Sequence, residues 1–223
     1  MSNYYEKIYE STLPVVVLKD TVAFPAISAT FEISDEASIE AVTNASENNT
    51  RVFLVCECEP SEKAPVIEGL YNVGTVAKIK QSIRTPEGRM RVLAEGISRA
   101  TVNEYKQNDN QITATLICKN IVLDSTDITA DAYIRAAISS LEKIHKYLSN
   151  ISNDIIAAAK AIKSPDLLAD FIASGILIKS YDKQRILECF DPLERISLLI
   201  QILNEETEVL SFEYESIWPI CAM

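Results

Sequence analysis

The residues that could perform bond chemistry are few in this sequence. The single histidine, His145, lies within LEKIHKYL, and a Ser-His or Cys-His nucleophile pair would have to use it. A helical position beside Lys143 and Lys146 favours a partly solvated side chain without a catalytic role. No serine lies in a G-x-S-x-G motif, which would place a nucleophile on a strained turn. We therefore assign no catalytic residue, and a hydrolase that depends on His145 is kept only as a third hypothesis.

The cysteines do not predict a metal centre or a disulfide framework. They are odd in number and scattered, at Cys56, Cys58, Cys118, Cys189 and Cys221. The pair at 56 and 58 resembles half of a zinc site, but structural zinc takes four ligands, usually in paired spacings. We expect Cys56 to be a small apolar strand residue, with Cys58 on the same face. The sequence thus indicates no metal and no cofactor, and it favours a reducing compartment.

The charge of the chain argues against nucleic acid and membrane partners. The formal net charge is −11 and the sequence pI is about 4.7, whereas binding to phosphates depends on Lys and Arg that displace counterions. Arg84, Arg89 and Arg91 form the one arginine cluster of note, and a solvated turn explains it better than an RNA footprint. The N-terminus resembles no signal peptide, and no apolar stretch approaches the roughly 18 residues of a membrane span. We expect a cytoplasmic protein. The sequence contains no ATP-binding G-x-x-x-x-G-K-[ST] loop.

The first half of the chain reads as strands with one helix. Short β-branched or alternating segments, separated by turn residues, predict about six strands. Thr85-Pro86-Glu87-Gly88 predicts the turn of a long hairpin, because Pro presets φ and Gly accepts a positive φ. Residues 34–49 predict a helix that Ser34 caps. The expected strands lie at residues 13–18, 26–33, 51–58, 72–84, 88–105 and 111–123.

The second half changes to helical spacing near residue 125. Apolar residues recur there at intervals of three and four, beginning with Ile134, Ile138 and Leu141. Ser164-Pro165-Asp166 is a helix start signal, and Gly175 suits the C-terminal end of that helix. Further helices are expected from Ser180 and from Asp191, where Glu194 is placed to complete a capping box. This half predicts an all-helical bundle.

Several of these segments together resemble the N-terminal domain of the Lon family of ATP-dependent proteases. They are LPVVVLKDTVAFPAISATFEI, RVFLVCECEP, LYNVGTVAKIKQSIRTPEGRMRVLAEGISRATV and SPDLLADFIASGILIKSYDKQRILECFDPLERISLLIQIL, within roughly residues 13 to 210. The resemblance implies an α+β fold, in which a PUA-like pseudo-β-barrel subdomain with one helix precedes an all-helical bundle. It also implies a role in selecting protein substrates for degradation.

These observations divide the chain into four expected parts. Residues 1–12 are expected to be a flexible N-terminal tail, and residues 13–123 the β-rich subdomain. Residues 124–210 are expected to form the helical bundle, and residues 211–223, SFEYESIWPICAM, a C-terminal tail.

A substrate-binding surface is predicted in the loop after the first strand. Pro25 fixes the shape of this loop, which carries Val22, Phe24 and Ile27, and Met90 from the hairpin tip extends the patch. Unfolded chains share exposed apolar side chains rather than a sequence, so a selector needs apolar surface of tolerant geometry. The alternative, that Phe24 and Ile27 plug one end of the barrel, is equally compatible with the sequence.

The leading hypothesis is therefore a non-catalytic substrate-recognition domain of a Lon-type protease. Its expected partners are unfolded, damaged or tagged proteins, further copies of itself, and downstream ATPase and protease modules, with no nucleic acid and no membrane. The alternative is a free-standing adaptor or receptor of the same fold that recruits clients to a partner. In that case residues 211–223 would be a docking segment.

Overall fold

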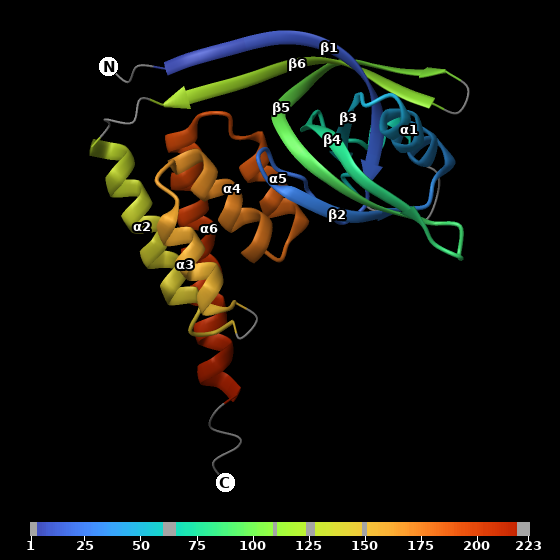
Figure 1. The fold of residues 1–223 in the computed structure, drawn as a ribbon. Helices are drawn as coiled ribbons and strands as arrows, with labels where there is room; N and C mark the ends of the chain where they lie inside the picture. Colours follow the sequence, from blue (N-terminus) through green and yellow to red (C-terminus); the bar gives the residue numbers. More distant parts are fainter. Residues whose placement is uncertain (1–3, 60–65, 109–110, 124–127, 149–150, 218–223) are drawn as a thin grey trace. The chain divides into compact units, whose positions relative to one another are not determined.

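The computed structural model describes residues 4–59, 66–108, 111–123, 128–148 and 151–217. The described residues form two compact units, one spanning Tyr4–Val122 and the other beginning at Leu123. The division falls one residue from the boundary expected between residues 123 and 124. Strands make up most of the first unit and helices the second, so the fold is α+β (Figure 1).

The first unit contains a mixed sheet of six strands and a single α-helix among its described residues. The helix, α1, spans Glu36–Glu47, and a short 3-10 turn, η1, spans Ile67–Gly69. The strands are β1 Tyr4–Leu18, β2 Ser28–Ile33, β3 Arg51–Cys56, β4 Val73–Arg84, β5 Met90–Asn108 and β6 Gln111–Leu123. The expected hairpin is confirmed as β4 and β5, and Gly88 at its turn has a φ of 82°.

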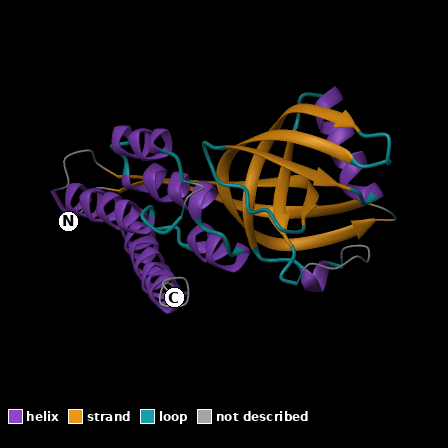
Figure 2. Ribbon diagram, turned by 90° about the horizontal axis from the view of Figure 1, so that it is seen from below, coloured by secondary structure: helices purple, strands orange, loops and turns teal. Residues whose placement is uncertain are grey.

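The strand pairings close into a ring. The order is β2-β5-β4-β3-β1-β6, and β5 also pairs with β6, so five strands encircle the core while β2 is attached to β5 alone. Only the β1–β3 pair is parallel among the pairs with a described register. β5 is 19 residues long. Its first part pairs with β2 and its second part with β6, and the strands curve around a common interior (Figure 2).

Burial on both faces explains the continuous apolar runs of β1 and β3. Alternate residues of a strand point to opposite faces. In β1, Val16 belongs to a cluster with α1 and β2, whereas Val15 and Val17 join a second cluster with β6. In β3, Leu54 and Phe53 divide in the same way. The expected strand at residue 51 is therefore present as β3, and it is buried on both faces.

The first strand begins far earlier than the sequence indicates. β1 starts at Tyr4, so the expected flexible tail of residues 1–12 is wrong for residues 4–12. The Tyr9 hydroxyl lies 3.1 Å from the Ser98 hydroxyl, which ties this part of β1 to β5. The polar composition of residues 4–12 hides the strand, because its partner β6 lies about a hundred residues away in the chain.

The helix α1 is capped and anchored by two polar side chains. The Asp35 carboxylate, rather than Ser34, accepts a 2.8 Å hydrogen bond from the Ser38 N–H. The buried Ser38 hydroxyl in turn accepts a 3.0 Å hydrogen bond from the Val17 N–H of β1. This contact holds α1 against the sheet, where Ala41 and Val42 are fully buried.

A close backbone approach fixes the loop between β1 and β2. A Cβ atom on Gly96 would overlap the carbonyl oxygen of Phe24, so only glycine fits this position of β5. The Ala26 N–H donates to the Gly96 carbonyl at 3.0 Å, and the Gly96 N–H donates to the Ile27 carbonyl at 3.1 Å. Ala26 adopts a φ of 58° to make this crossing. The loop is therefore part of the sheet architecture.

The second unit contains five α-helices among the described residues. They are α2 Ile128–Ile144, α3 Asn153–Ala161, α4 Pro165–Ile176, α5 Ser180–Glu188 and α6 Pro192–Ile217. α4 begins at Pro165 and α5 at Ser180, as expected. Gly175 lies inside α4 rather than at its end, because the helix continues to Ile176. None of the helices described is both long and apolar enough to cross a membrane.

The helix α6 continues beyond its expected end. It runs to Ile217, so residues 211–217 are helical, and the expectation of a tail starting at residue 211 is wrong there. The rest of the expected tail, residues 218–223, lies outside the described residues. At the other end, the Asp191 carboxylate accepts hydrogen bonds from the N–H groups of Leu193 and Glu194 at 2.8 and 3.0 Å. Asp191 thus caps the helix from the expected position.

A buried ion pair joins α4 to α6. Arg195 Nη1 lies 3.7 Å from Asp170 Oδ1, and both side chains are 4% exposed. The same guanidinium donates to the carbonyls of Cys189 and Phe190 at 2.7 and 2.9 Å. It thus satisfies backbone oxygens at the end of α5 as well as the carboxylate. One side chain therefore fixes three helices of this unit.

We expect Gly96→Ala to destabilise the β-rich unit by about 1–3 kcal/mol, because the added methyl group displaces the backbone at Phe24. Urea unfolding followed by circular dichroism measures the change. Gly175→Ala is the matched control, since nothing lies within 4 Å of its added Cβ and alanine favours a helix interior. Equal stability of Gly96→Ala and the native chain would contradict the close approach.

We expect Arg195→Met to cost about 3–5 kcal/mol of stability, because it leaves the Asp170 carboxylate buried without its cation. Arg185→Met is the control. Arg185 pairs with Asp182 at 3.1 Å on the same helix, at a partly exposed site, so its loss should cost less than about 1 kcal/mol. Thermal unfolding of both variants at one pH compares their losses of stability. Equal losses would show that the buried Arg195–Asp170 pair stabilises the fold no more than the partly exposed Arg185–Asp182 pair does.

Candidate functional site

The possible nucleophiles do not assemble into a catalytic site among the described residues. His145 is half-buried just after α2, and its Nδ1 atom has no hydrogen-bond partner there. The Cys56 thiol is buried, and its Sγ atom lies 3.6 Å from the Lys19 carbonyl. Burial, with smaller contributions from Asp20 and Glu57, raises the pKa of Cys56 to about 12. This thiol is therefore protonated at neutral pH and is not poised for attack.

The two neighbouring cysteines also lie in different environments. β3 ends at Cys56, which is buried, and Cys58 beyond it is exposed. The expectation that Cys58 occupies the same strand face is therefore wrong. Within the described parts of the chain, no three His, Cys, Asp or Glu side chains are grouped as a metal ion would require.

Two of the three clustered arginines of the hairpin, Arg89 and Arg91, lie beside one carboxylate. Arg91 donates to Glu32 Oε1 through Nε at 3.1 Å and through Nη2 at 2.6 Å. Arg89 lies 3.9 Å from the same carboxylate. Glu32 therefore offsets part of the positive charge that binding to a phosphate backbone would require.

The loop predicted to bind substrate does not present its apolar side chains to solvent. Phe24 is 1% exposed, Val22 and Met90 are also buried, and Pro25 and Ile27 are half-buried. The Thr75 hydroxyl donates to the Ala23 carbonyl at 2.7 Å and holds the loop inward. The prediction of an exposed patch is therefore wrong for Val22, Phe24 and Met90. Met90 packs in the core cluster under α1, and a role for Pro25 and Ile27 in binding stays a prediction.

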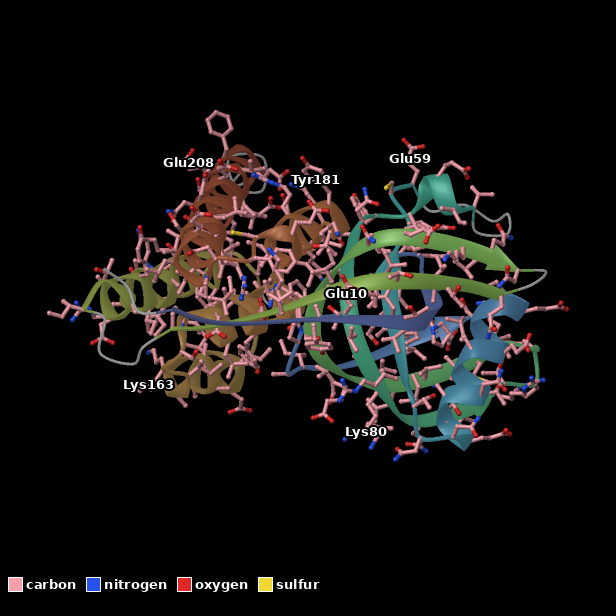
Figure 3. All side chains as sticks on the ribbon, turned by 90° about the horizontal axis from the view of Figure 1, so that it is seen from above. Glu10, Glu59, Lys80, Lys163, Tyr181 and Glu208 are labelled. Atoms are coloured by element: carbon pink, nitrogen blue, oxygen red, sulfur yellow. The ribbon has the colours of Figure 1, made fainter. Side chains whose placement is uncertain are left out.

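The exposed apolar side chains of the helical unit lie elsewhere. Two of them, Ile178 and Tyr181, are 65% and 64% exposed at the turn between α4 and α5. We call this pair the α4–α5 corner. Tyr181 projects from the outside of the unit in Figure 3. Two more, Val209 and Phe212, lie on the C-terminal part of α6 and are 51% and 75% exposed.

Local structure forces Ile178 outward. α4 ends at Ile176, and the next residue, Leu177, is buried and has extended backbone, so its neighbour must face the other side. Lys179 then reaches Glu206 of α6 in a 2.9 Å ion pair. Beneath the turn lies a cavity of about 10 Å³ whose walls include Ile144, Leu148 and Ile202. The apolar side chains under Ile178 thus leave little empty space. The corner therefore offers a surface for binding rather than a pocket.

Tyr181 is held in place by its own helix. The Arg185 guanidinium lies 5.7 Å from the centre of the Tyr181 ring, one turn along α5, and Asp182 holds that guanidinium at 3.1 Å. The ring therefore stays exposed with a defined face. Sequence reasoning missed this site because Ile178 and Tyr181 are single apolar residues next to polar ones, with no pattern that separates them from core positions.

Comparisons with known proteins identify the family. The model of the ATP-dependent protease La (LON) substrate-binding domain matches residues 12–205. The chain is 33% identical over 219 residues to a Lon protease of Clostridioides difficile (strain 630), covering 96% of this chain and 27% of that protein. It is 32% identical over 206 residues to a Lon protease of Bacillus thuringiensis (strain Al Hakam), covering 92% of this chain and 26% of that protein.

The fold is also shared with solved structures. The N-terminal domain of the Mycobacterium avium complex Lon protease matches with a TM-score of 0.62 and 19% identity, over 87% of this chain and 98% of that one. A Lon N-terminal domain protein from Xanthomonas campestris matches with a TM-score of 0.52 and 12% identity, over 86% of this chain and 98% of that one.

The chain spans about a quarter of the length of the curated relatives described above. The matching part is the substrate-binding domain and excludes the ATPase and protease regions. The family match, the relatives and the fold agree, and the chain belongs to the family of Lon substrate-binding domains.

Proposed function

We propose that this chain is the substrate-recognition domain of a Lon-type ATP-dependent protease and binds unfolded or tagged protein segments through exposed apolar surface. The supporting observation is the α4–α5 corner, where Ile178 and Tyr181 face solvent on a chain of a substrate-binding family. The finer architecture that we propose with it is a PUA-like pseudo-barrel followed by a helical bundle.

The chemistry of the corner suits a tolerant binder. Burying one side chain of this size against a client contributes roughly 1.5–3 kcal/mol, whereas association costs about 4–15 kcal/mol of translational and rotational freedom. A single corner therefore binds weakly, and it discriminates by exposed apolar surface rather than by sequence. Self-association would bring several corners together and raise the effective concentration of each.

Weak capture is also what a degrading machine requires at this step. A client must be held long enough to be passed on, and then released. We propose that ATPase and protease modules supply those later steps, as the names of the family and of the relatives suggest. We also propose that the protein is cytoplasmic.

A free-standing adaptor of the same fold is the second candidate. The extension of α6 to Ile217, with Phe212 exposed near its end, favours a docking role for this segment. The adaptor would recruit clients through the same corner and use α6 for its partner.

We expect the double variant Ile178→Asp, Tyr181→Ser to weaken binding to a permanently unfolded protein at least about fivefold, because it removes both exposed apolar side chains. The probe is fluorescein-labelled, reduced and alkylated lactalbumin, and the measurement is fluorescence anisotropy with the whole chain.

The matched control is Ile83→Asp, which makes the same change at a 54% exposed isoleucine of the β-rich unit. Its affinity should equal that of the native chain. Unchanged binding by the corner variant would remove the corner as the site, and absence of binding by the native chain would remove the proposed function.

A further inference from the structure

The C-terminal part of α6 carries an exposed face of mixed apolar and acidic character. Val209 and Phe212 lie three residues apart, and carboxylates occur three or four residues from them. These residues share one side of the helix, and all five are exposed. We call this face the α6 ridge, formed by Glu205, Glu208, Val209, Phe212 and Glu213.

The ridge is separate from the face that α6 uses to pack. The Tyr214 ring lies 6.1 Å from the Tyr147 ring in an edge-on contact, so this side of α6 faces the end of α2. Two residues along a helix turn the direction by about 200°, so Phe212 points away from that contact. Figure 1 shows this end of α6 running past α2 and α3, and Figure 3 shows Glu208 on the outside.

The charge around the ridge has one sign. Arg195 is the last basic residue of the sequence, and residues 196–223 contain five glutamates and no Lys, Arg or His. Glu206 is paired with Lys179, but within the described chain no Lys or Arg pairs with a carboxylate of the ridge. An apolar strip is thus bordered by uncompensated negative charge.

This charge decides between possible occupants. A second copy that docked through the same ridge would bring six ridge carboxylates together, and like charges across an interface cost affinity. An anionic client is disfavoured for the same reason, on a chain of net charge −11. A segment with apolar and cationic side chains complements the ridge in two ways. Its apolar side chains cover the apolar strip, and its ammonium or guanidinium groups pair with the glutamates.

We propose that the α6 ridge selects unfolded segments in which apolar side chains alternate with Lys or Arg. The inference rests on the proposed function and narrows its substrate class. Val209 and Phe212 lose water against the apolar side chains of the client, while Glu205, Glu208 and Glu213 attract its cations. Attraction between exposed charges is screened by salt, so the preference must fall as ionic strength rises.

The test uses the whole chain and two fluorescein-labelled 14-residue peptides with identical Leu and Phe positions. One peptide carries Lys at the remaining positions and the other carries Glu. We expect the Lys peptide to bind at least about tenfold more tightly at about 50 mM salt and less than about threefold more tightly at about 500 mM. Fluorescence anisotropy measures both affinities.

Two variants locate the effect on the ridge. Glu205→Gln, Glu208→Gln, Glu213→Gln should reduce the preference for the Lys peptide to less than about threefold at low salt. Phe212→Ser should weaken that peptide at least about threefold. The matched control is Glu36→Gln, Glu40→Gln, Glu47→Gln on α1, which changes the net charge equally at exposed positions of the other unit and should leave the preference intact.

Several outcomes would overturn the inference. Equal affinity for the two peptides would do so, as would an equal loss of preference in the α1 control, which would assign the effect to net charge alone. If neither peptide bound but unfolded lactalbumin still did, the ridge would not be a binding site for such segments, and the proposed function would still stand. If Phe212→Ser instead abolished self-association in sedimentation experiments without affecting peptides, the ridge would be a contact between copies.

Discussion

The architecture of the β-rich unit depends on the close contact between Gly96 and the carbonyl of Phe24. The loop from β1 to β2 crosses β5 so tightly that no side chain fits between them. Hydrogen bonds from Ala26 and Gly96 secure the crossing, and the Thr75 hydroxyl holds the carbonyl of Ala23. This arrangement delivers β2 to the first part of β5 and leaves the second part free to pair with β6. The same contact accompanies the burial of Phe24, whose side chain is part of the core.

The two units use their apolar residues in different ways. The β-rich unit buries both faces of β1 and β3, between the ring interior on one side and α1 on the other. In the helical unit, buried polar contacts also join the helices: the Arg195 guanidinium lies between the Asp170 carboxylate and the carbonyls at the end of α5. In the turn between α4 and α5, Leu177 is buried while its neighbour Ile178 faces solvent. The side chains of Ile178, Tyr181 and Phe212 are exposed in this unit.

The sequence predicts local structure well and burial poorly, for physical reasons. Turn chemistry and helix start signals are local, so the β4–β5 hairpin and the starts of α4 and α5 are placed correctly. Residues 4–12 belong to β1 only because distant β6 pairs with that strand, and a polar segment gives no local sign of it. The sequence leaves Phe24 undecided between an exposed patch and the end of the barrel, because its burial depends on a glycine 72 positions later. Ile178 and Tyr181 were missed because their exposure follows from where α4 ends.

The two exposed surfaces of the helical unit differ in what they can discriminate. The α4–α5 corner offers an aliphatic side chain and an aromatic ring, with Lys179 paired to Glu206 and Arg185 to Asp182, so its charges are largely compensated. The α6 ridge offers similar apolar area among carboxylates without cationic partners in the described chain. Apolar contact alone reports only that a segment is unfolded, since every unfolded chain exposes such side chains. Charge adds a second criterion that acts at longer range and depends on salt. A domain with both surfaces can hold many clients weakly through one and rank them through the other.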